Sequence, residues 1–390
     1  MRLEGLELVD YRSFRHARLD LGPGAHVLVG PNAQGKTNLL EAVHFLGIGA
    51  SHRVAGEGPL VRSGAQAAIV RAVCLLAGQR RLTVELELRP AGRSRARVNG
   101  QPRPRTRDAI GLVRSVLFAP EDVSLVRGDP AERRRFLDDL LGQRRPSYLA
   151  ARHEYERALR QRNTLLRHAG QDAPGEATLA AWTETLVRTG APLLAARVAA
   201  VHALAGPAAD AYRELVDTRS RAGAEVALSY QLSTGRSVPG RTGAGVPDPA
   251  SLADELRAGL AAVAADERQR GTTLAGPHRD ELRLDVGGLA ARGYASHGEV
   301  WSLALALRLG SLAVLGEVGE EPIVLLDDVF AELDETRRAR LARRCRDYDQ
   351  VLVTAAVDED VPLQGRRHEV RRDDADGAAA PGGVSGAGEA

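Results

Sequence analysis

The chain has little of several residue types that mark common classes of protein. It has two cysteines, Cys74 and Cys345, whose separation fits no metal site, so we expect reduced thiols in a cytosol. Its longest apolar run, residues 300–314, contains Arg308 and is too short to span a bilayer. The first residues lack the apolar core of a signal peptide. These absences predict a cytoplasmic protein without a membrane partner.

Charge of one sign is not in excess either. The chain has 53 basic and 51 acidic residues and a formal net charge of +2. No global field therefore indicates a polyanionic partner, and any basic surface must be local. With 390 residues, the chain is long enough for a large core and for two or more domains.

Lysine is nearly absent, and the only lysine, Lys36, stands in a recognisable loop. Residues 30–37 match the pattern G-x-x-x-x-G-K-[ST], the phosphate-binding P-loop. An apolar run over residues 26–29 predicts a buried strand before the loop, and helical spacing over residues 38–46 predicts a helix after it. Glycines let successive backbone N–H groups point at one anion, and the helix adds its positive end. A surface turn with a stray lysine is the alternative.

This loop predicts an ATP site. Lys36 would reach the β- and γ-phosphates and assist catalysis, and the Thr37 hydroxyl would ligate Mg²⁺. The ammonium group of a lysine acts on bound phosphates as a compact point charge. All other basic side chains of this sequence, apart from histidine, are arginine. The predicted nucleotide-binding residues of the loop are Gly30, Pro31, Asn32, Ala33, Gln34, Gly35, Lys36 and Thr37.

A second apolar run, residues 322–326, ends in the paired acids Asp327 and Asp328. A buried strand that brings carboxylates to the magnesium edge of a P-loop is typical of a Walker B element. We expect Asp327 to hold Mg²⁺, directly or through water, and Asp328 to polarise the attacking water as the catalytic base. Buried strands often end in acids, but in one chain with a P-loop the pair predicts ATP hydrolysis.

A third candidate element is the sequence Ser-His-Gly-Glu at residues 296–299, which precedes an apolar helical run to residue 315. Ser296, Gly298 and Glu299 at a helix N-terminus predict a second anion site. Two phosphate sites with one magnesium site suggest a nucleotide shared by two copies, one supplying the P-loop and the other this loop. The alternative is an ordinary helix cap by Ser296.

The most basic segment, residues 89–107, holds seven arginines and no acid. Asn99-Gly100 in its middle predicts a hairpin turn. Such a hairpin is a plausible contact for a DNA backbone, but a solvated edge that deters strand pairing is an equal alternative. Arg53 and Arg62, in a polar loop over residues 51–64, are candidate phosphate or partner contacts, and solvated loop arginines are the alternative. Residues 133–135 and the helix predicted over residues 148–168 are the next candidates for DNA contacts.

Several of these stretches resemble one family. The sequence around Ser296 resembles the signature motif of ABC-type ATPases in their RecF and SMC form. Residues 330–334, Phe-Ala-Glu-Leu-Asp, resemble their D-loop, and residues 351–354 resemble the strand that leads to their switch position. Three further stretches resemble the RecF family in particular: residues 118–122 (FAPED), 133–138 (RRRFLD) and 273–280 (TLAGPHRD).

The resemblance covers residues 1–354 and implies an α/β fold: an ABC-type P-loop ATPase head, a mixed sheet flanked by helices, with an inserted, mainly helical domain. The expected divisions are residues 1–120 (first part of the ATPase lobe), 121–269 (helical insertion), 270–372 (second part of the lobe) and 373–390 (disordered tail). Where RecF signatures usually carry glutamine this chain has His297, and Thr354 stands where transporter relatives carry histidine. No Q-loop glutamine occurs near residues 119–122.

What the resemblance implies is a DNA repair and recombination mediator in the cytoplasm, associated with the nucleoid. Such a protein forms an ATP-dependent homodimer, binds single- and double-stranded DNA at gaps, and works with RecO and RecR to load RecA. Its slow ATPase acts as a switch. Three other classes stay open: an SMC-like structural ATPase, which would need a long coiled coil; a transporter-type ABC subunit with a membrane partner; and a small-molecule P-loop kinase, which would leave the Ser296 loop unexplained.

Overall fold

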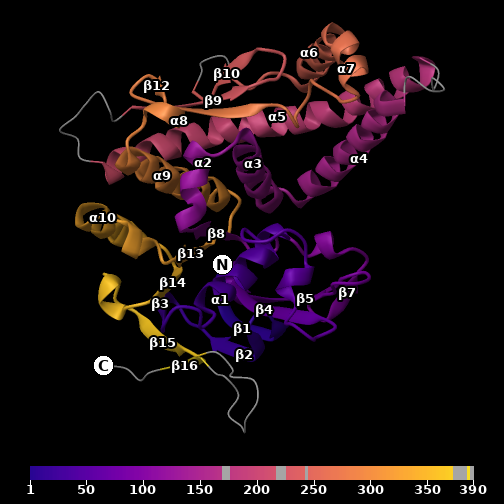
Figure 1. Ribbon diagram of the computed structural model, residues 1–390. Coiled ribbons are helices and arrows are strands. Elements are labelled where there is room, and N and C mark those ends of the chain that lie inside the picture. Colours follow the sequence, from indigo (N-terminus) through magenta and orange to yellow (C-terminus); the bar gives the residue numbers. More distant parts are fainter. Residues whose placement is uncertain (169–175, 217–224, 242–244, 372–383, 387–390) are drawn as a thin grey trace. The chain divides into compact units, whose positions relative to one another are not determined.

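The structure, a computed structural model, describes residues 1–168, 176–216, 225–241, 245–371 and 384–386 (Figure 1). It divides into two compact units. Unit 1 comprises Met1–Asp122 and Ser311–Ala390, and unit 2 comprises Val123–Gly310. Strands and helices mix in both, which confirms the predicted α/β class.

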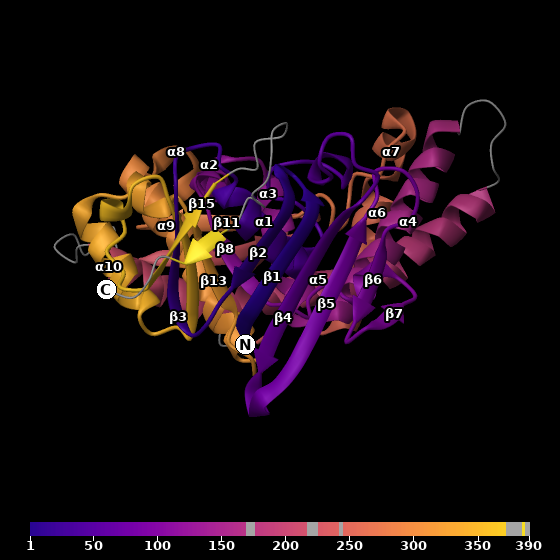
Figure 2. The same cartoon turned by 90° about the horizontal axis from the view of Figure 1, so that it is seen from below.

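The first sheet of unit 1 is antiparallel and has the strand order β2-β1-β4-β5-β6-β7. Figure 2 shows β1, β4 and β5 as long neighbouring strands. Buried and less buried residues alternate along β4 and β5, so one face of the sheet packs into the core and the other faces solvent. The strands are β1 Arg2–Tyr11, β2 Phe14–Asp20, β4 Ala68–Leu76, β5 Arg80–Leu88, β6 Arg95–Val98 and β7 Gln101–Arg103.

The second sheet of unit 1 has the order β16-β15-β3-β14-β13-β8. Its strands from β15 to β8 are parallel, and every residue of β13 and β14 is buried, as expected for strands covered on both faces. Helix α1 packs against β8, β13 and β14. The elements are β3 Gly24–Val29, α1 Lys36–Ile48, β8 Ser115–Phe118, β13 Ile323–Asp327, α10 Glu335–Cys345, β14 Gln350–Ala355, β15 Arg366–Val370 and β16 Val384–Gly386.

Unit 2 packs helices around a small antiparallel sheet with the order β10-β9-β11-β12. The 40-residue helix α5 is its longest described element and contacts α3, α4, α6 and β9. The elements are α2 Val123–Arg127, α3 Pro130–Arg144, α4 Pro146–His168, α5 Glu176–Leu215, β9 Val226–Gln231, β10 Ser237–Pro239, α6 Pro249–Ala262, α7 Ala264–Arg270, β11 Glu281–Val286, β12 Leu289–Ala290, α8 Ala291–Tyr294 and α9 His297–Gly316.

The limits of the two units differ from the expected divisions at one end. The first boundary, after Asp122, lies close to the expected one after residue 120. The second lies after Gly310, and β11, which pairs with β9 from Glu281↔Gln231 to Val286↔Val226, falls within unit 2. Most of the tail expected to be disordered, residues 373–390, lies outside the described residues; Val384–Gly386 form β16 beside β15.

Two helices, α5 and α9, are long and apolar enough to cross a membrane by length and composition alone. More than half of the most apolar window of each is buried inside the protein. In α9 the buried side chains include Val300, Trp301 and Leu307. Helices of this kind commonly form the core of a soluble protein, and burial accounts for the apolar run predicted over residues 300–314.

Candidate nucleotide-binding site and basic surface

The carboxyl ends of four parallel strands meet at one edge of the second sheet of unit 1. The register pairs Val29 with Ala355, Thr354 with Asp327, and Leu326 with Phe118. In open α/β sheets, ligands bind at the carboxyl edge of parallel strands. This edge therefore carries the P-loop, the paired acids and the end of β14 together.

The P-loop lies between β3 and α1, as the sequence predicts, and its glycines are required by close contacts. A Cβ atom on Gly30 would lie 2.6 Å from the carbonyl oxygen of Val370. Gly35 has φ 100°, and a Cβ there would lie 2.6 Å from the ring of Phe14. Any side chain at either position would push the loop away from its neighbours, so both glycines hold it against the sheet.

Lys36 is folded back over this loop. Its Nζ donates hydrogen bonds to the carbonyl oxygens of Gly30 (2.6 Å) and Pro31 (3.0 Å), and its side chain is buried. Burial lowers the pKa of Lys36, and the carboxylates of Asp328 and Asp327 act in the opposite direction. The ammonium group is thus held at the loop where a phosphate oxygen could accept its hydrogen bonds.

Asp327 joins three segments of the site. Thr37 Oγ1 donates a hydrogen bond to Asp327 Oδ1 (2.9 Å), and Thr354 Oγ1 donates to the same oxygen (2.6 Å). The carboxylate is buried, and burial raises its pKa against the lowering effect of these two hydrogen bonds. The Thr354 hydroxyl also accepts a hydrogen bond from the Asp328 N–H (2.9 Å). Thr354, whose role the sequence left open, is therefore a support for both acids.

Thr37 and Asp327 are suitable ligands for magnesium. Both present hard oxygen donors, which Mg²⁺ prefers, and Mg²⁺ takes few protein ligands because phosphates and water fill its other positions. Within the described ranges, no group of three or more His, Cys, Asp or Glu side chains is arranged to hold a metal ion. Thr37 and Asp327, joined by their hydrogen bond (2.9 Å), are the residues that fit a magnesium ion bound together with a nucleotide.

Asp328 leaves the strand in an unusual conformation. Its φ is 50°, a left-handed value that few residues with a side chain adopt, and such strain concentrates at functional sites. The strand β13 ends at Asp327, and Asp328 begins the turn that follows it. Two adjacent carboxylates with different surroundings are able to perform different roles.

A buried ion pair supports α1 behind the P-loop. Arg12 donates to both carboxylate oxygens of Glu41 (2.8 and 2.6 Å), and Ser51 donates to Glu41 Oε1 (2.5 Å). Burial favours a higher pKa for Glu41, but the hydrogen bonds from Arg12 and Ser51 outweigh it and lower the pKa. Arg53 donates to Asn38 (3.2 Å) and Arg62 pairs with Asp10 (2.7 Å), contacts that a structural role explains.

The Ser296 loop lies in unit 2, at the start of α9. The Ser296 N–H donates to Glu299 Oε2 (2.8 Å), and the Glu299 N–H donates to Ser296 Oγ (3.3 Å). These two bonds form a capping box, which is the ordinary helix cap considered as the alternative from sequence. The cap uses Ser296 Oγ as an acceptor, so its O–H is not needed for the cap. Ser296 and His297 are exposed, and Gly298 and Glu299 are half-buried.

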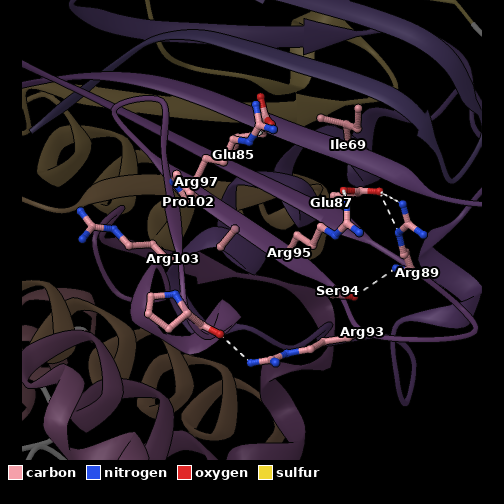
Figure 3. Close-up of a pocket in the computed structure, with 12 residues that line it drawn as sticks. Ile69, Glu85, Glu87, Arg89, Arg93, Ser94, Arg95, Arg97, Pro102 and Arg103 are labelled. Atoms are coloured by element: carbon pink, nitrogen blue, oxygen red, sulfur yellow. Dashed lines mark hydrogen bonds and ion pairs between the residues drawn. The ribbon is translucent and has the colours of Figure 1, made fainter.

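The basic segment forms the predicted hairpin, β6 and β7, with Asn99 at φ 50° and Gly100 at φ 76°. It lines a pocket of about 780 Å³ (Figure 3). Five arginines contribute to the pocket, with two glutamates from β5. The lining residues include Glu85, Glu87, Arg89, Arg93, Arg95, Arg97 and Arg103.

Ion pairs occupy part of this basic surface. Across the solvent face of the sheet, charges alternate in register from Glu7 to Arg71, Glu85 and Arg97, as expected for stabilising cross-strand pairs. Arg97 is nevertheless 4.0 Å from Glu85 and Arg95 is 3.9 Å from Glu87, and their side chains are 63% and 70% exposed. These two arginines therefore keep donors available to an anion.

The other pocket arginines differ in how they are held. Arg89 pairs with Glu87, and Arg93 donates to the carbonyl oxygen of Pro104 (2.5 Å). The Arg103 side chain has neither an ion-pair nor a hydrogen-bond partner among the described residues, although its backbone pairs with β6. Figure 3 shows both held contacts as dashed lines and none at Arg103. The structure therefore explains the contacts of Arg89 and Arg93, whereas DNA binding by the other arginines of the segment stays a prediction.

The most specific family-like stretches form a buried network in unit 2. Arg197 on α5 donates to both oxygens of Asp138 (2.9 and 3.0 Å) and to the carbonyl of Pro277 (2.6 Å). Arg133 donates to Glu281 (2.6 and 3.0 Å), and Arg134 donates to the carbonyl of Asp280 (2.8 Å). These residues hold α3, α5 and β11 together. Arg133 and Arg134 are consequently poor candidates for DNA contacts.

Fold and site define an ABC-type P-loop ATPase of the kind found in SMC heads. An Smc head crystallised with the C-winged helix domain of ScpA has the same fold, with a TM-score of 0.51, 15% identity and coverage of 95% of this chain and 94% of that one. Residues 2–370 match the family "RecF/RecN/SMC N terminal domain".

Closer relatives narrow the class to one family. The DNA replication and repair protein RecF of Streptomyces avermitilis is 49% identical over 379 residues, covering 95% of this chain and 98% of that protein. RecF of Frankia alni is 50% identical over 377 residues, with the same coverage. A structure of "the recombination mediator protein RecF-ATPrS in RecFOR pathway" matches with a TM-score of 0.86, 26% identity and coverage of 99% of this chain and 98% of that one. The chain belongs to the RecF family.

Proposed function

We propose that this chain is an ATP-dependent DNA-binding ATPase that acts in DNA replication, repair and recombination. The observation that carries the proposal is the hydrogen bond from Thr37 of the P-loop to Asp327 of β13 (2.9 Å). It brings a P-loop hydroxyl and a strand-end carboxylate to one point, as a magnesium–nucleotide site requires. The RecF relatives, whose names refer to DNA replication and repair, support the biological assignment.

In this proposal the P-loop binds ATP and the neighbouring residues divide the remaining work. Backbone N–H groups of residues 30–37 and the ammonium of Lys36 bind phosphate oxygens, and Thr37 with Asp327 would hold Mg²⁺. When bound, the ion would neutralise charge on the phosphates. Asp328 orients and polarises the attacking water, while Thr354 keeps Asp327 in position through its 2.6 Å hydrogen bond.

ATP joins two copies of the chain. The P-loop of one copy binds the nucleotide, and Ser296, Gly298 and Glu299 of the other contribute the second part of the cradle. The ordered capping box keeps that loop in one conformation before it meets an anion. Hydrolysis is slow and releases the dimer, so the ATPase works as a switch. A small-molecule P-loop kinase would have no use for this second loop.

The dimer binds DNA near single-strand gaps in the cytoplasm, at the nucleoid. The incompletely paired Arg95 and Arg97, with Arg103, are the candidate contacts for phosphate groups, because sequence-independent binding to a backbone needs guanidinium donors and no base contacts. RecO and RecR are the proposed protein partners, and loading of RecA is the proposed outcome. A membrane partner has no part in this proposal, which separates it from a transporter-type subunit.

A binding titration tests the proposal directly. Duplex DNA with a gap and an intact duplex of the same length are titrated with the protein, with and without ATP and Mg²⁺. We expect tighter binding with ATP and a preference for the gapped duplex, with footprint protection at the junction. Equal affinity for both duplexes, or no effect of ATP on either, would contradict the proposed DNA function.

A further inference from the structure

Two buried histidines, His26 and His368, lie on neighbouring strands beside the P-loop. His26 is in β3, four residues before Gly30, and His368 is in β15 (Figure 1). Each is 2% exposed. Nδ1 of His26 is 2.9 Å from Nε2 of His368, a hydrogen-bond distance at which one neutral ring donates and the other accepts. The pair is a polar contact inside the sheet, apart from the residues assigned to the nucleotide site.

The hydrogen bond between the two rings is anchored at its His26 end. Nε2 of His26 lies 3.0 Å from the carbonyl oxygen of Gly22 and 3.2 Å from the Gly22 nitrogen, so this ring has a partner on both sides. His26 thereby connects the segment before β3 to β15. Because a buried donor or acceptor without a partner is costly, removal of the His368 ring would leave Nδ1 of His26 unsatisfied in the interior.

β15 packs closely against β3 and the P-loop at both of its ends. Before β15, a Cβ atom on Gly365 would overlap the carbonyl oxygen of Ala25 in β3. At the other end, a Cβ atom on Gly30 would lie 2.6 Å from the carbonyl oxygen of Val370. The histidine pair lies between these two contacts. Since close-packed interiors transmit small shifts, a movement of β15 on β3 would reach the P-loop at Gly30.

The surroundings of the pair keep both rings neutral at neutral pH. Burial lowers the pKa of His26 and outweighs the hydrogen bond to the Gly22 carbonyl, which raises it; the guanidinium of Arg366 lowers it further. Burial, the His26 ring and Arg366 lower the pKa of His368 to about 4. No carboxylate among the described residues acts on the pKa of either ring. A neutral amide that reaches the same point can therefore replace the neutral His368 ring as a hydrogen-bond donor.

We propose that His368 is a positioning residue for the P-loop. Through its hydrogen bond to His26 it holds β15 against β3, and so keeps the Val370 carbonyl in the contact with Gly30 that supports ATP binding. The inference rests on the proposed function, because it concerns the same nucleotide site. His368 acts through the two strands and not by contact with the nucleotide. Loss of the pair should therefore weaken ATP binding while the chemistry at Asp328 is unchanged.

Variants of His368 that differ in reach test the proposal. His368→Ala removes the hydrogen bond, His368→Gln places an amide N–H near the position of Nε2, and the shorter side chain of His368→Asn does not reach His26. The control is His16→Gln, which changes an exposed histidine of β2. We expect the ATP dissociation constant, measured by calorimetry with Mg²⁺, to rise roughly fivefold or more in His368→Ala and His368→Asn. His368→Gln and His16→Gln should stay within about twofold of the unmodified protein.

Two further measurements separate positioning from a general loss of structure. At saturating ATP the turnover number of His368→Ala should stay within about twofold of the unmodified value, since the acids at the end of β13 are untouched. In a double-mutant cycle with His26→Ala, the two changes should not add, because both remove the same hydrogen bond. The double variant should therefore bind ATP about as tightly as either single variant. Circular dichroism checks that each variant is folded.

The possible results separate this inference from the function on which it rests. If the unmodified protein does not bind ATP, the proposed function fails and the positioning role fails with it. If the unmodified protein binds ATP, and His368→Asn binds it as tightly as His368→Gln, the positioning role alone is overturned. Additive effects in the cycle, or a turnover number that falls as far as the affinity, also overturn it. Should His368→Ala fail to fold, the comparison of His368→Asn with His368→Gln decides.

Discussion

At the level of single residues, Asp327 is the point at which the P-loop, β13 and β14 meet. One of its oxygens accepts hydrogen bonds from Thr37 and Thr354 (2.9 and 2.6 Å). Asp328, the next residue, has a left-handed backbone conformation and lies outside the strand. Adjacent carboxylates in such different surroundings should be separable by mutation.

The two acids should give different defects when each is changed to asparagine. Asp327→Asn weakens the candidate magnesium ligand, so we expect lower affinity for Mg²⁺-ATP. Asp328→Asn removes the base but not the ligand, so binding should persist while turnover falls by roughly 100-fold or more. Calorimetry with and without Mg²⁺ and single-turnover hydrolysis measure these effects. Variants that behave alike in binding and in turnover would refute the division of roles.

Lys36 is the second residue whose removal is informative. Lys36→Met keeps the length of the side chain and removes its charge. Because hydrogen bonds to charged groups contribute about 1.5–3 kcal/mol, we expect ATP affinity to fall roughly 10–100-fold. Circular dichroism should show that the fold is retained, since the ammonium binds only two loop carbonyls. Unchanged ATP affinity would remove the basis for the P-loop assignment.

The helices, strands and loops of the molecule differ in how well they could be predicted from the sequence. The P-loop and the β13 acids could be predicted because a run of consecutive residues carries each signal. The hydrogen bond from Thr354 to Asp327 could not, because it depends on β14 lying beside β13 in the sheet. For the same reason, the pairing of β11 with β9, which falls within unit 2, is invisible in the local pattern of residues 270–310.

The composition of the basic hairpin predicts more unpaired positive charge than its surface presents. Arginine content alone cannot show that Arg89 is bound by Glu87, since the two are brought together by the sheet. The rest of the hairpin's guanidinium groups are few, and not all of their N–H donors have a partner. Its contribution to DNA binding can be measured by neutralisation rather than charge reversal, because glutamate at 95 or 97 would face Glu87 or Glu85.

Changing the four arginines at 95, 97, 103 and 105 to glutamine should weaken DNA binding on every sequence and leave ATP affinity unchanged. Each lost phosphate contact should reduce the slope of log affinity against log salt by about 0.9 for duplex DNA. The control is Arg15→Gln with Arg18→Gln, two exposed arginines of β2 at the other edge of the same sheet. If the salt slope is the same in all three proteins, the hairpin is only a solvated edge, and the arginines of α4 become the next candidates.

At the scale of the whole molecule, a half-buried histidine, His278, makes stability depend on pH. Burial, together with nearby Arg279, Arg134 and Arg197, lowers the pKa of His278 to about 4. Its neutral ring bridges the Tyr155 hydroxyl (2.6 Å) and the Thr273 carbonyl (3.1 Å). Since the unfolded pKa is 6.5, the unfolded chain binds more protons than the folded one between these values, and stability falls as pH drops from 6.5 towards 4.

We therefore expect His278 to account for a loss on the order of 1–3 kcal/mol of stability between pH 6.5 and pH 4. Both tryptophans, Trp182 and Trp301, lie in unit 2, so their fluorescence in urea titrations reports on its unfolding. In His278→Asn the unfolding free energy should fall less steeply over this range. Buried carboxyls such as Asp139, whose pKa burial raises to about 6, act in the opposite direction and are common to both proteins. Equal slopes would contradict a neutral, half-buried His278.

The central claim is that two copies of the chain together complete the nucleotide site. A mixture of two variants tests this claim directly. Ser296→Arg blocks the loop of one half, and Lys36→Met disables the P-loop of the other. Each variant alone should hydrolyse little ATP and stay monomeric with it. A heterodimer pairs the intact P-loop of one variant with the intact Ser296 loop of the other, so one whole site remains.

Hydrolysis by the equimolar mixture should therefore recover to at most roughly half of the unmodified rate, because only heterodimers form and each holds one working site of two. Sedimentation of the mixture with ATP should show dimers that neither variant forms alone. A mixture that hydrolyses no more than the sum of its parts, together with a Ser296→Arg protein that dimerises and turns over at the unmodified rate, would contradict the composite site.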